Sequence, residues 1–495
     1  MAGLPEIASR PASAYLAAAG NRACPALAGF QRMSRMARDT TDTTPITSRD
    51  DLVTWFERGN KSADQLRIGT EHEKFPFYRA DLAPVPYDGP EARLGGIRAL
   101  LDGMERRTGW ERIDDAGKPI GLSNEVAGGA ISLEPGGQFE LSGAPLRTLH
   151  ETQAETLAHL ADLKAVADPL GIGFLGVGSS PKWTRADTPV MPKSRYKIMA
   201  GYMPRVGTRG LDMMFRTSTV QVNLDFVSEA DMVRKLRVAL ALQPVATALF
   251  ANSPFTEGRP NGYLSARSHI WLDTDRARSG MLPFAFDADM GFERYVDYAL
   301  DVPMYFVKRG STYHDVTGRS FRELLAGRLD AVPGERATLS DWANHLSTIF
   351  PEVRLKRFLE MRGADVGPEP MITALGALFV GLLYDTAALD AASDLIRPWS
   401  TQAMQSLREQ VPRLALKAEI GGRSVRAVAT DVLAIARQGL DRRGFEDGAG
   451  RTESQYLDPL DAIVSTGQTQ AQDLLARFDG PWRNSVDPLF TERAY

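Results

Sequence analysis

The chain has 495 residues, of which 43% are hydrophobic and 24% are charged, an ordinary globular mixture that supports a large buried core. The formal net charge is −4, so the totals give no basic surface for nucleic acid, and we expect no nucleic-acid partner. The longest uncharged apolar stretch, residues 370–384, is shorter than the roughly 18–20 residues of a membrane span and predicts a buried helix. We therefore expect no membrane partner.

The first 35 residues differ from the rest of the chain. They hold four arginines and one acid among many alanines, a composition similar to an organelle transit peptide. The composition is explained equally well if Met33 or Met36 is the true first residue and the stretch before it is untranslated sequence read from an upstream start. The single cysteine, Cys24, lies here, and excludes an intrachain disulfide or a cysteine-based metal site. One cysteine fits a reducing compartment, so we expect a cytoplasmic protein, with organelle targeting as the alternative.

Helix signals recur along the chain. Ser48 followed by Asp51 is a capping box that predicts a helix start. Amphipathic runs predict further helices over residues 89–107, 149–171 and 228–250. From Asp341 onward the chain reads as mostly helical, with a polar loop over residues 442–454.

Four segments instead alternate apolar and polar residues with a period of two, which predicts half-buried strands. They are residues 68–77, 130–143, 218–226 and 353–362, the second with a Pro-Gly-Gly turn inside it. Side chains two residues apart point to the same face of a strand. We expect an antiparallel sheet with one face against helices and one polar face.

The polar face would gather a set of acids and an amide: Glu71, Glu73, Glu134, Gln138, Glu140 and Glu360. Carboxylates this close repel one another unless cations neutralise them. Oxygen ligands suit Mg²⁺, which often bridges carboxylates to nucleotide phosphates. A solvated strand face is the plainer interpretation of any one acid, and the recurrence in three segments favours a shared metal site.

Arginine is the other recurrent residue, at positions 195, 205, 209, 216, 267 and 362. Its planar guanidinium suits carboxylates and phosphates, although most arginines are surface residues or structural ion pairs. Arg362 lies two residues from Glu360, on the same predicted face. The G-x-G-x-x-G match at residues 171–176 follows a helix and leads into no second helix, so it does not predict a dinucleotide site.

Several long motifs together resemble plant-type glutamate–cysteine ligase, a group also found in proteobacteria. They include GTEHEKF, LEPGGQFELSG, GLDMMFRTSTVQVNLDF, ANSPFTEGRPNG and FPEVRLKRFLEMRGAD. The resemblance runs from about residue 45 to the C-terminus and implies one catalytic domain over residues 45–495. It implies an α+β fold, a glutamine-synthetase-like antiparallel sheet curved into a funnel with helices packed outside. The implied reaction joins the γ-carboxylate of L-glutamate to the amine of L-cysteine through a γ-glutamyl phosphate, with ATP converted to ADP.

The resemblance also assigns residues. It implies that Mg²⁺ ions are bound by Glu71, Glu73, Glu140 and Glu360, with Glu134, Gln138 and Gln221 as less certain ligands. Related ligases place a histidine at the position of Gln221. Arg362 is the implied catalytic residue for phosphoryl transfer. Arg195, Arg216, Arg267 and Tyr305 are the implied glutamate-binding residues.

Other functions stay open from the sequence. The nearest is a γ-glutamyl ligase with a different amine acceptor; a Mg²⁺-dependent hydrolase and a non-catalytic binding protein are more distant. The expected oligomeric state is a monomer or a homodimer. Plant members carry cysteines that form regulatory disulfides, and the matching positions here are Val316 and Ala331. The redox switch is therefore not expected.

Overall fold

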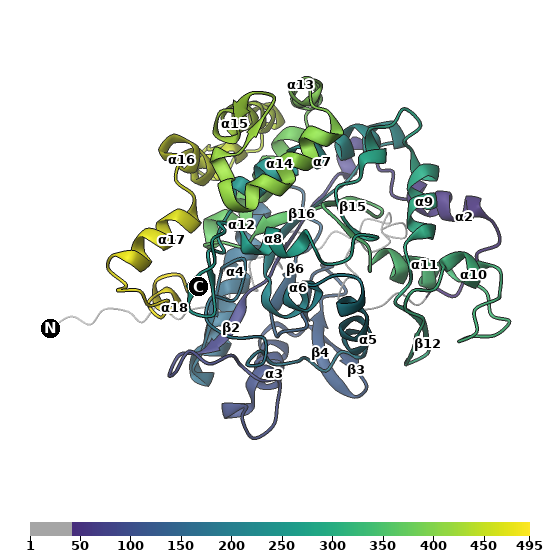
Figure 1. Cartoon of the computed structure of the whole chain (residues 1–495), viewed down its shortest axis with the longest axis horizontal. Helices are drawn as coiled ribbons and strands as arrows, with labels where there is room; N and C mark the ends of the chain where they lie inside the picture. Colours follow the sequence, from purple (N-terminus) through teal and green to yellow (C-terminus); the bar gives the residue numbers. More distant parts are fainter. Residues whose placement is uncertain (1–41) are drawn as a thin grey trace, which may run out of the picture.

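The computed structural model describes residues 42–495, so the expectations for residues 1–35 and Cys24 lie outside the described residues. Its centre is an open eight-stranded sheet, drawn in Figure 1, in which every neighbouring pair is antiparallel. In spatial order the strands are β15 (Val353–Leu355), β16 (Leu359–Asp365), β8 (Thr219–Leu224), β1 (Ile68–His72), β6 (Phe139–Ser142), β5 (Ala130–Leu133), β4 (Lys118–Ser123) and β3 (Glu111–Asp115). The predicted α+β class with an antiparallel sheet is confirmed.

Two strand predictions are wrong in their form. Residues 68–77 do not make a single strand, because β1 ends at His72 and the following strand, β2 (Phe75–Tyr78), belongs to another sheet. Glu73 therefore lies between the two strands. Residues 353–362 do not make a single strand but the hairpin β15–β16, in which Arg354 lies directly opposite Glu360. The Lys356 amide donates to the Phe358 carbonyl at the turn. Residues paired across an antiparallel ladder share a face. The alternation of apolar and polar residues therefore continues through the turn, and the sequence pattern does not reveal where the turn lies.

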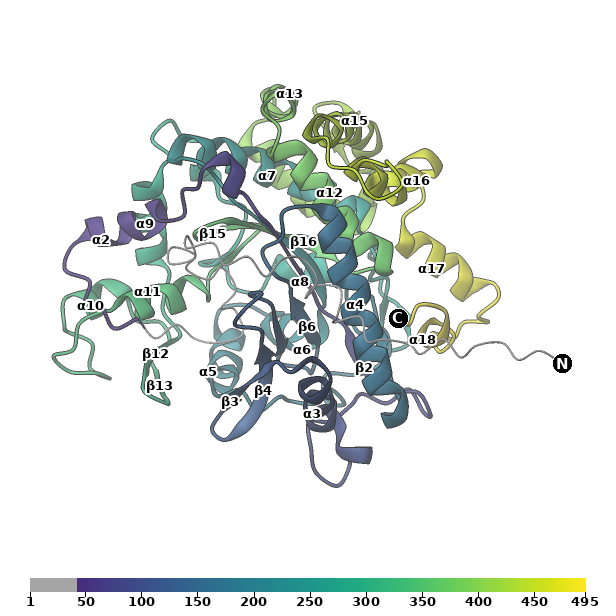
Figure 2. The ribbon, with the colours of Figure 1, turned by 180° about the vertical axis from the view of Figure 1, so that it is seen from behind.

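Helices cover the apolar face of the sheet. Val220, Val222 and Leu224 of β8 are fully buried in a core shared with helices α7 (Glu229–Leu249) and α12 (Glu369–Leu383). Helix α4 (Leu149–Ala167) packs against α12 and β1, and Figure 2 shows α4 beside α12 from behind. An outer layer consists of α13 (Thr386–Ile396), α14 (Thr401–Leu414), α15 (Val425–Arg443), α16 (Asp458–Thr466), α17 (Gln470–Asp479) and α18 (Leu489–Glu492).

The predicted helices are present with adjusted ends. Helix α2 (Arg49–Glu57) begins with the Ser48–Asp51 capping box. Helix α3 (Gly96–Thr108) begins later than expected, because residues 93–95 form a separate 3₁₀ turn and Gly95 takes a positive φ of 92°. Helix α4 gives way to a 3₁₀ turn at 168–170 that Gly171 closes with φ 65°, so this glycine ends a helical segment.

The remaining described α-helices lie around the polar face of the sheet. Helices α5 (Ser194–Tyr202), α6 (Gly210–Arg216) and α8 (Ala266–Trp271) come first, with α9 (Phe292–Asp301), α10 (Phe321–Leu325) and α11 (Leu339–Leu346) farther out. Five two-stranded sheets complete the described part: β2 (Phe75–Tyr78) with β7 (Ile172–Leu175), β9 (Phe255–Thr256) with β10 (Arg259–Pro260), β11 (Ser279–Gly280) with β14 (Phe350–Pro351), β12 (Phe306–Arg309) with β13 (Thr312–Asp315), and β17 (Glu419–Ile420) with β18 (Arg423–Ser424).

The predicted buried helix at residues 370–384 is α12, and most of it is enclosed by the core. Among the described residues no single helix is long and apolar enough to cross a membrane. Helices α12 and α13 reach the required length and hydropathy together, but they meet at a bend of 90°.

Candidate functional site

The register of the sheet brings the predicted acids to one face. Glu71 of β1 lies opposite Gln221 of β8 on one side and Ser142 of β6 on the other. Glu140, two residues before Ser142 on β6, lies opposite Ser132 of β5. Glu360 of β16 lies opposite Asn223 of β8. Because directly paired residues share a face, these side chains all project to the side away from α7 and α12.

A pocket lies over this face, between the sheet and helices α5, α6 and α8. Its charged lining is Glu73, Glu134, Arg195, Arg267 and Arg362. Its other lining residues are Pro135, Gln138, Tyr196, Met199, Met213, Met214, Thr217, Thr219, Gln221, Trp271, Ser347, Thr348 and Phe350. Three guanidinium groups in one partly apolar pocket favour a ligand with carboxylate or phosphate groups.

Glu71 and Glu140 beneath the pocket are buried, and Glu73 beside it is partly buried. Burial, followed by the charges of Glu360 and Glu140, raises the pKa of Glu71 to about 8. Burial and the nearby Glu134 raise the pKa of Glu73 well above its usual range, and the same two causes raise the pKa of Glu140. The raised pKa values mean that the surrounding protein compensates the negative charge of these carboxylates poorly when they are ionised.

Their hydrogen bonds are few. Glu71 Oε1 accepts from Asn223 Nδ2 at 2.6 Å, while the buried Oε2 has no hydrogen-bond partner among the described residues. Glu140 accepts from Ser132 Oγ at 2.6 Å. Glu73 accepts from the backbone amide of Thr219 at 3.1 Å. Glu71 therefore keeps an oxygen that can accept a cation or a donor.

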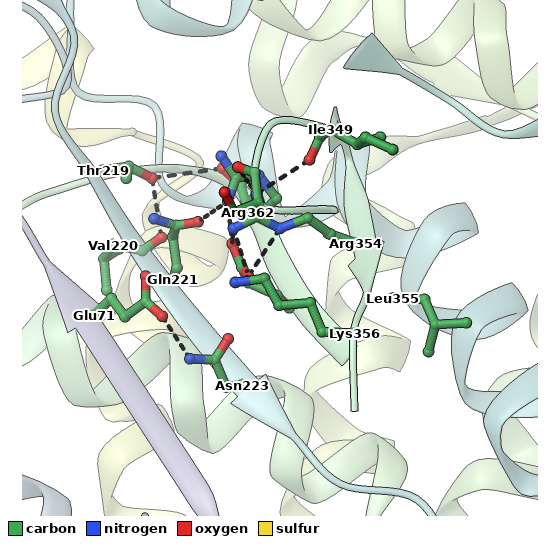
Figure 3. A network of polar contacts seen from close by, with 12 residues as sticks. Glu71, Thr219, Val220, Gln221, Asn223, Ile349, Arg354, Leu355, Lys356 and Arg362 are labelled. Atoms are coloured by element: carbon green, nitrogen blue, oxygen red, sulfur yellow. Dashed lines mark hydrogen bonds and ion pairs between the residues drawn. The ribbon is translucent and has the colours of Figure 1, made fainter. Parts of the chain in front are cut away.

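Glu360 has the opposite environment (Figure 3). Arg354 donates hydrogen bonds to both carboxylate oxygens of Glu360. Lys356 Nζ lies 3.1 Å from Oε2, and Arg362 donates to Oε1. Burial alone would raise the pKa of Glu360, but the charges of Arg354, Lys356 and Arg362 outweigh burial and hold it well below its usual range. This carboxylate is ionised and surrounded by cations.

Arg362 lies at an irregularity in the sheet. The pairing of β16 with β8 shifts register between Met361 and Ala364, which makes a β-bulge at Arg362 and Gly363. Bulges redirect side chains and often occur near active sites. From the bulge, Arg362 Nη1 donates to Gln221 Oε1 at 2.6 Å, so the predicted catalytic residue and the predicted ligand Gln221 are in direct contact.

The other predicted residues divide into two groups. Arg195, Arg267, Glu134 and Gln221 line the pocket. Arg216 and Tyr305 are not part of its lining. Arg216 pairs with Glu257 at 2.9 Å, and the buried Tyr305 ring lies 3.8 Å from the Arg278 guanidinium, so both have structural partners in the present arrangement.

Gln138 does line the pocket, but its amide is occupied. Its Oε1 accepts from the Gly136 amide at 2.9 Å and its Nε2 donates to the Thr217 carbonyl at 2.7 Å. These bonds tie the β5–β6 turn to the segment before β8. Gln138 thus supports the pocket wall, and we leave it out of the metal site proposed below.

The acids fit Mg²⁺ by their chemistry. Within residues 42–495 no three acidic, histidine or cysteine side chains form a ready metal-binding group. Mg²⁺ does not require one, since it is typically held by one or two carboxylates together with substrate phosphates and water. The unpartnered Oε2 of Glu71 fits a cation, which would also favour the ionised forms of Glu71, Glu73 and Glu140.

Sequence reasoning did not single out three residues of the site. Asn223 donates a hydrogen bond to Glu71. Arg354 and Lys356 form ion pairs with Glu360 and neutralise it. Their signal was the charge pattern: two cations precede Glu360 by six and four residues, which a hairpin turn brings together.

The fold and the site together define a protein with an arginine-lined pocket over the acidic polar face of an antiparallel sheet. Comparison with known proteins specifies it further. The family model described as glutamate–cysteine ligase family 2 matches residues 67–492. The chain is 56% identical over 453 residues to a chloroplastic glutamate–cysteine ligase of Arabidopsis thaliana, covering 92% of this chain and 84% of that protein. It is 54% identical over 453 residues to glutamate–cysteine ligase B, chloroplastic, of Oryza sativa subsp. japonica, covering 92% and 88%. The chain belongs to glutamate–cysteine ligase family 2.

Among solved structures, the fold is similar to a glutamate–cysteine ligase of Francisella tularensis in complex with AMP. The TM-score is 0.49 and the identity 14%, with 88% of this chain and 90% of that chain covered.

One expectation is corrected by these relatives. The low cysteine count led us to expect a cytoplasmic protein, whereas the plant relatives are named as chloroplastic proteins. Cysteine usage reports the redox state of a compartment and not its identity, which is why the inference was wrong.

Proposed function

We propose that this protein joins the γ-carboxylate of L-glutamate to the amine of L-cysteine, with ATP converted to ADP and phosphate. Membership of glutamate–cysteine ligase family 2 supports the reaction. The observation in the structure that carries it is the pocket in which three arginines lie beside an acidic sheet face. A dicarboxylate and a triphosphate both need such cationic partners.

The chemistry follows from the reactivity of the substrates. A carboxylate is a poor electrophile, so its γ-oxygen first attacks the terminal phosphorus of ATP and ADP leaves. The amine then attacks the acyl phosphate, and phosphate departs as the amide bond forms. Holding these groups in line can supply several kcal/mol of the barrier reduction, on the order of 7–11 kcal/mol in the best cases.

The chain's own residues take the following roles in the proposal. Arg195 and Arg267 bind the carboxylates of glutamate from the α5 and α8 sides of the pocket. Arg362 stabilises the transferring phosphoryl group, because its guanidinium projects from the bulge into the pocket. Glu71, Glu73 and Glu140 would hold Mg²⁺, with Glu134 at the edge, and the ion would supply charge neutralisation on the phosphates. Glu360 and Gln221, which the resemblance also implies as ligands, are left out of this metal site because Arg354, Lys356 and Arg362 surround Glu360 and because Gln221 Oε1 accepts from Arg362.

An ADP-release assay tests the proposal. Release is expected only when glutamate, cysteine, ATP and Mg²⁺ are all present, and γ-glutamylcysteine should form in equal amount. ADP release without an amine would point to a hydrolase instead. Release that is faster with another amine than with cysteine would support the alternative of a γ-glutamyl ligase with a different acceptor. Absence of turnover with every amine would favour a binding protein.

A further inference from the structure

We infer that Arg354 is a positioning residue that fixes Glu360 and, through it, the guanidinium of Arg362. The inference rests on the proposed function of Arg362 and extends it to a residue outside the pocket. Arg354 does not line the pocket, and its side chain is 2% exposed. Figure 3 shows the side chain of Arg354 beside that of Arg362.

Every N–H of the Arg354 guanidinium is used. Its Nη2 reaches Glu360 Oε1 at 2.7 Å and Oε2 at 2.8 Å, and its Nε reaches Oε2 at 3.1 Å. Its Nη1 donates to the carbonyls of Ser347 at 2.9 Å and Ile349 at 3.1 Å. A guanidinium has five N–H donors in a rigid fork, so a fully engaged one holds its partners in one geometry.

The hydrogen-bond partners of the Arg354 guanidinium belong to two different parts of the site. Ser347, Thr348 and Phe350 are pocket-lining residues of the segment that follows α11. Glu360 belongs to the sheet beneath the pocket. Arg354 therefore joins one wall of the pocket to its floor, and a change of its length or shape would move the two relative to each other.

The charges around Glu360 explain how this serves Arg362. Glu360 carries one negative charge, and the buried Arg354 and Lys356 already neutralise it. Arg362 is thus the third cation around one carboxylate, so the group as a whole keeps a net positive charge that is available to an anion in the pocket. Glu360 orients Arg362 through Nη1, together with Gln221.

Phe350 adds a steric support. The guanidinium carbons of Arg362 and Arg354 lie 5.6 Å and 5.9 Å from the centre of its ring. One aromatic ring therefore contacts both arginines from the pocket wall. Arginine faces and aromatic rings attract one another, which limits the tilt of both guanidinium groups.

A double-mutant cycle tests the inference. Arg354→Lys keeps the charge but cannot hold both oxygens and both carbonyls. We expect kcat to fall about 10–100-fold, as for misplacement of a catalytic group by about 1 Å, with the KM values for ATP and glutamate changed less than about threefold. In an Arg362→Lys background the same change should cost less than about threefold, because the group that Arg354 positions has been removed. Additive losses would overturn the inference.

A matched control separates positioning from stability. Arg443 makes a comparable arginine–carboxylate pair with the buried Glu453, in the helical layer behind the sheet. Arg443→Lys should lower the Tm to a similar extent and leave kcat unchanged. If Arg354→Lys does not fold, Arg354→Gln, which keeps a planar donor for the carbonyls, replaces it in the cycle. Failure of both to fold would assign Arg354 to stability alone and overturn the inference.

A crystal structure of Arg354→Lys gives a test that does not depend on turnover. The guanidinium of Arg362 should leave its contact with Gln221 Oε1, and an unchanged contact would overturn the inference. This result also distinguishes two failures. An inactive wild-type enzyme in the ADP-release assay rejects the proposed function, whereas an unmoved Arg362 rejects the positioning role.

Discussion

Arg267 Nη2 donates a hydrogen bond of 2.8 Å to the backbone carbonyl of Arg362. Two of the three arginines that line the pocket are therefore joined through the backbone of Arg362. The Thr247 hydroxyl donates a hydrogen bond of 2.9 Å to the next backbone carbonyl, that of Gly363. The bulge is thus fixed on its backbone by Arg267 and Thr247, and at its side chain by Glu360.

Replacing Arg362 with lysine should lower kcat by roughly 10²–10³-fold while the KM values for ATP and glutamate rise less than about fivefold. Lysine keeps the charge but loses the planar fork, and an interaction made mainly in the transition state is lost from kcat. Steady-state kinetics with each substrate varied in turn measure the split. A change confined to KM would reassign Arg362 to binding of the ground state.

Glu71→Gln and Glu73→Gln should each reduce kcat by roughly 10²–10⁴-fold, which corresponds to a lost electrostatic contribution of about 3–5 kcal/mol. The Tm should stay level or rise, because burial and like charges already raise both pKa values and the amide removes that penalty. Glu419→Gln, an exposed acid in β17, is the control and should change neither quantity. Near-normal turnover at saturating Mg²⁺ would exclude both acids as ligands.

Most of the sheet could be predicted from the sequence because its alternation is regular. The faces of β8 and β1 follow from a period of two, and the acids of the polar face follow with them. The Ser48–Asp51 capping box likewise fixes the start of α2 by local chemistry alone. These features depend on neighbours in the chain, which is why sequence patterns reveal them.

What could not be predicted depends on contacts between distant segments. The pairing of Arg216 with Glu257 and the packing of Tyr305 against Arg278 are set by tertiary structure, so the resemblance alone placed both in the binding site. The bulge at Arg362 and the hairpin turn before it leave no trace in an alternating pattern.

The bulge also explains why residue 363 is glycine. A Cβ at this position would lie 2.6–2.9 Å from the side chain of Gln243 on α7, too close without movement. Gly363→Ala should displace the bulge, lower kcat by about tenfold or more, and lower the Tm. Both polar atoms of the Gln243 amide lack hydrogen-bond partners among the described residues, so Gln243→Ala should restore part of both losses in the double variant. If kcat does not recover in the double variant, the position of the bulge does not control the rate of the reaction.

Activity should not depend on the redox state of the enzyme. Cys24 is the single cysteine of the 495 residues, so no intrachain disulfide can form. Initial rates should agree within about twofold for enzyme that has been oxidised or reduced and then freed of reagent, with the substrate cysteine kept reduced. Cys24→Ser should behave in the same way. A several-fold change that Cys24→Ser abolishes would make the N-terminal segment regulatory.

Glu155 of α4 should make folding stability depend on pH. Burial raises the pKa of this carboxyl to about 7 from an ordinary 4.5, although its Oε1 accepts from the Ala144 amide at 2.8 Å. Below pH 4.5 both folded and unfolded chains hold the proton, and Glu155 adds no pH dependence. Between 4.5 and about 7 the unfolded chain releases it first, so stability falls as pH rises.

The measurement is the Tm of wild type and Glu155→Gln across this range of pH. The amide keeps an oxygen for the Ala144 amide and cannot ionise, so the variant should match wild type near pH 5 and exceed it by about 1–3 °C at pH 8. Glu91→Gln, an exposed acid in a loop, should follow wild type throughout. A difference in Tm that is equal at pH 5 and pH 8 would show that Glu155 acts through packing and not through its proton.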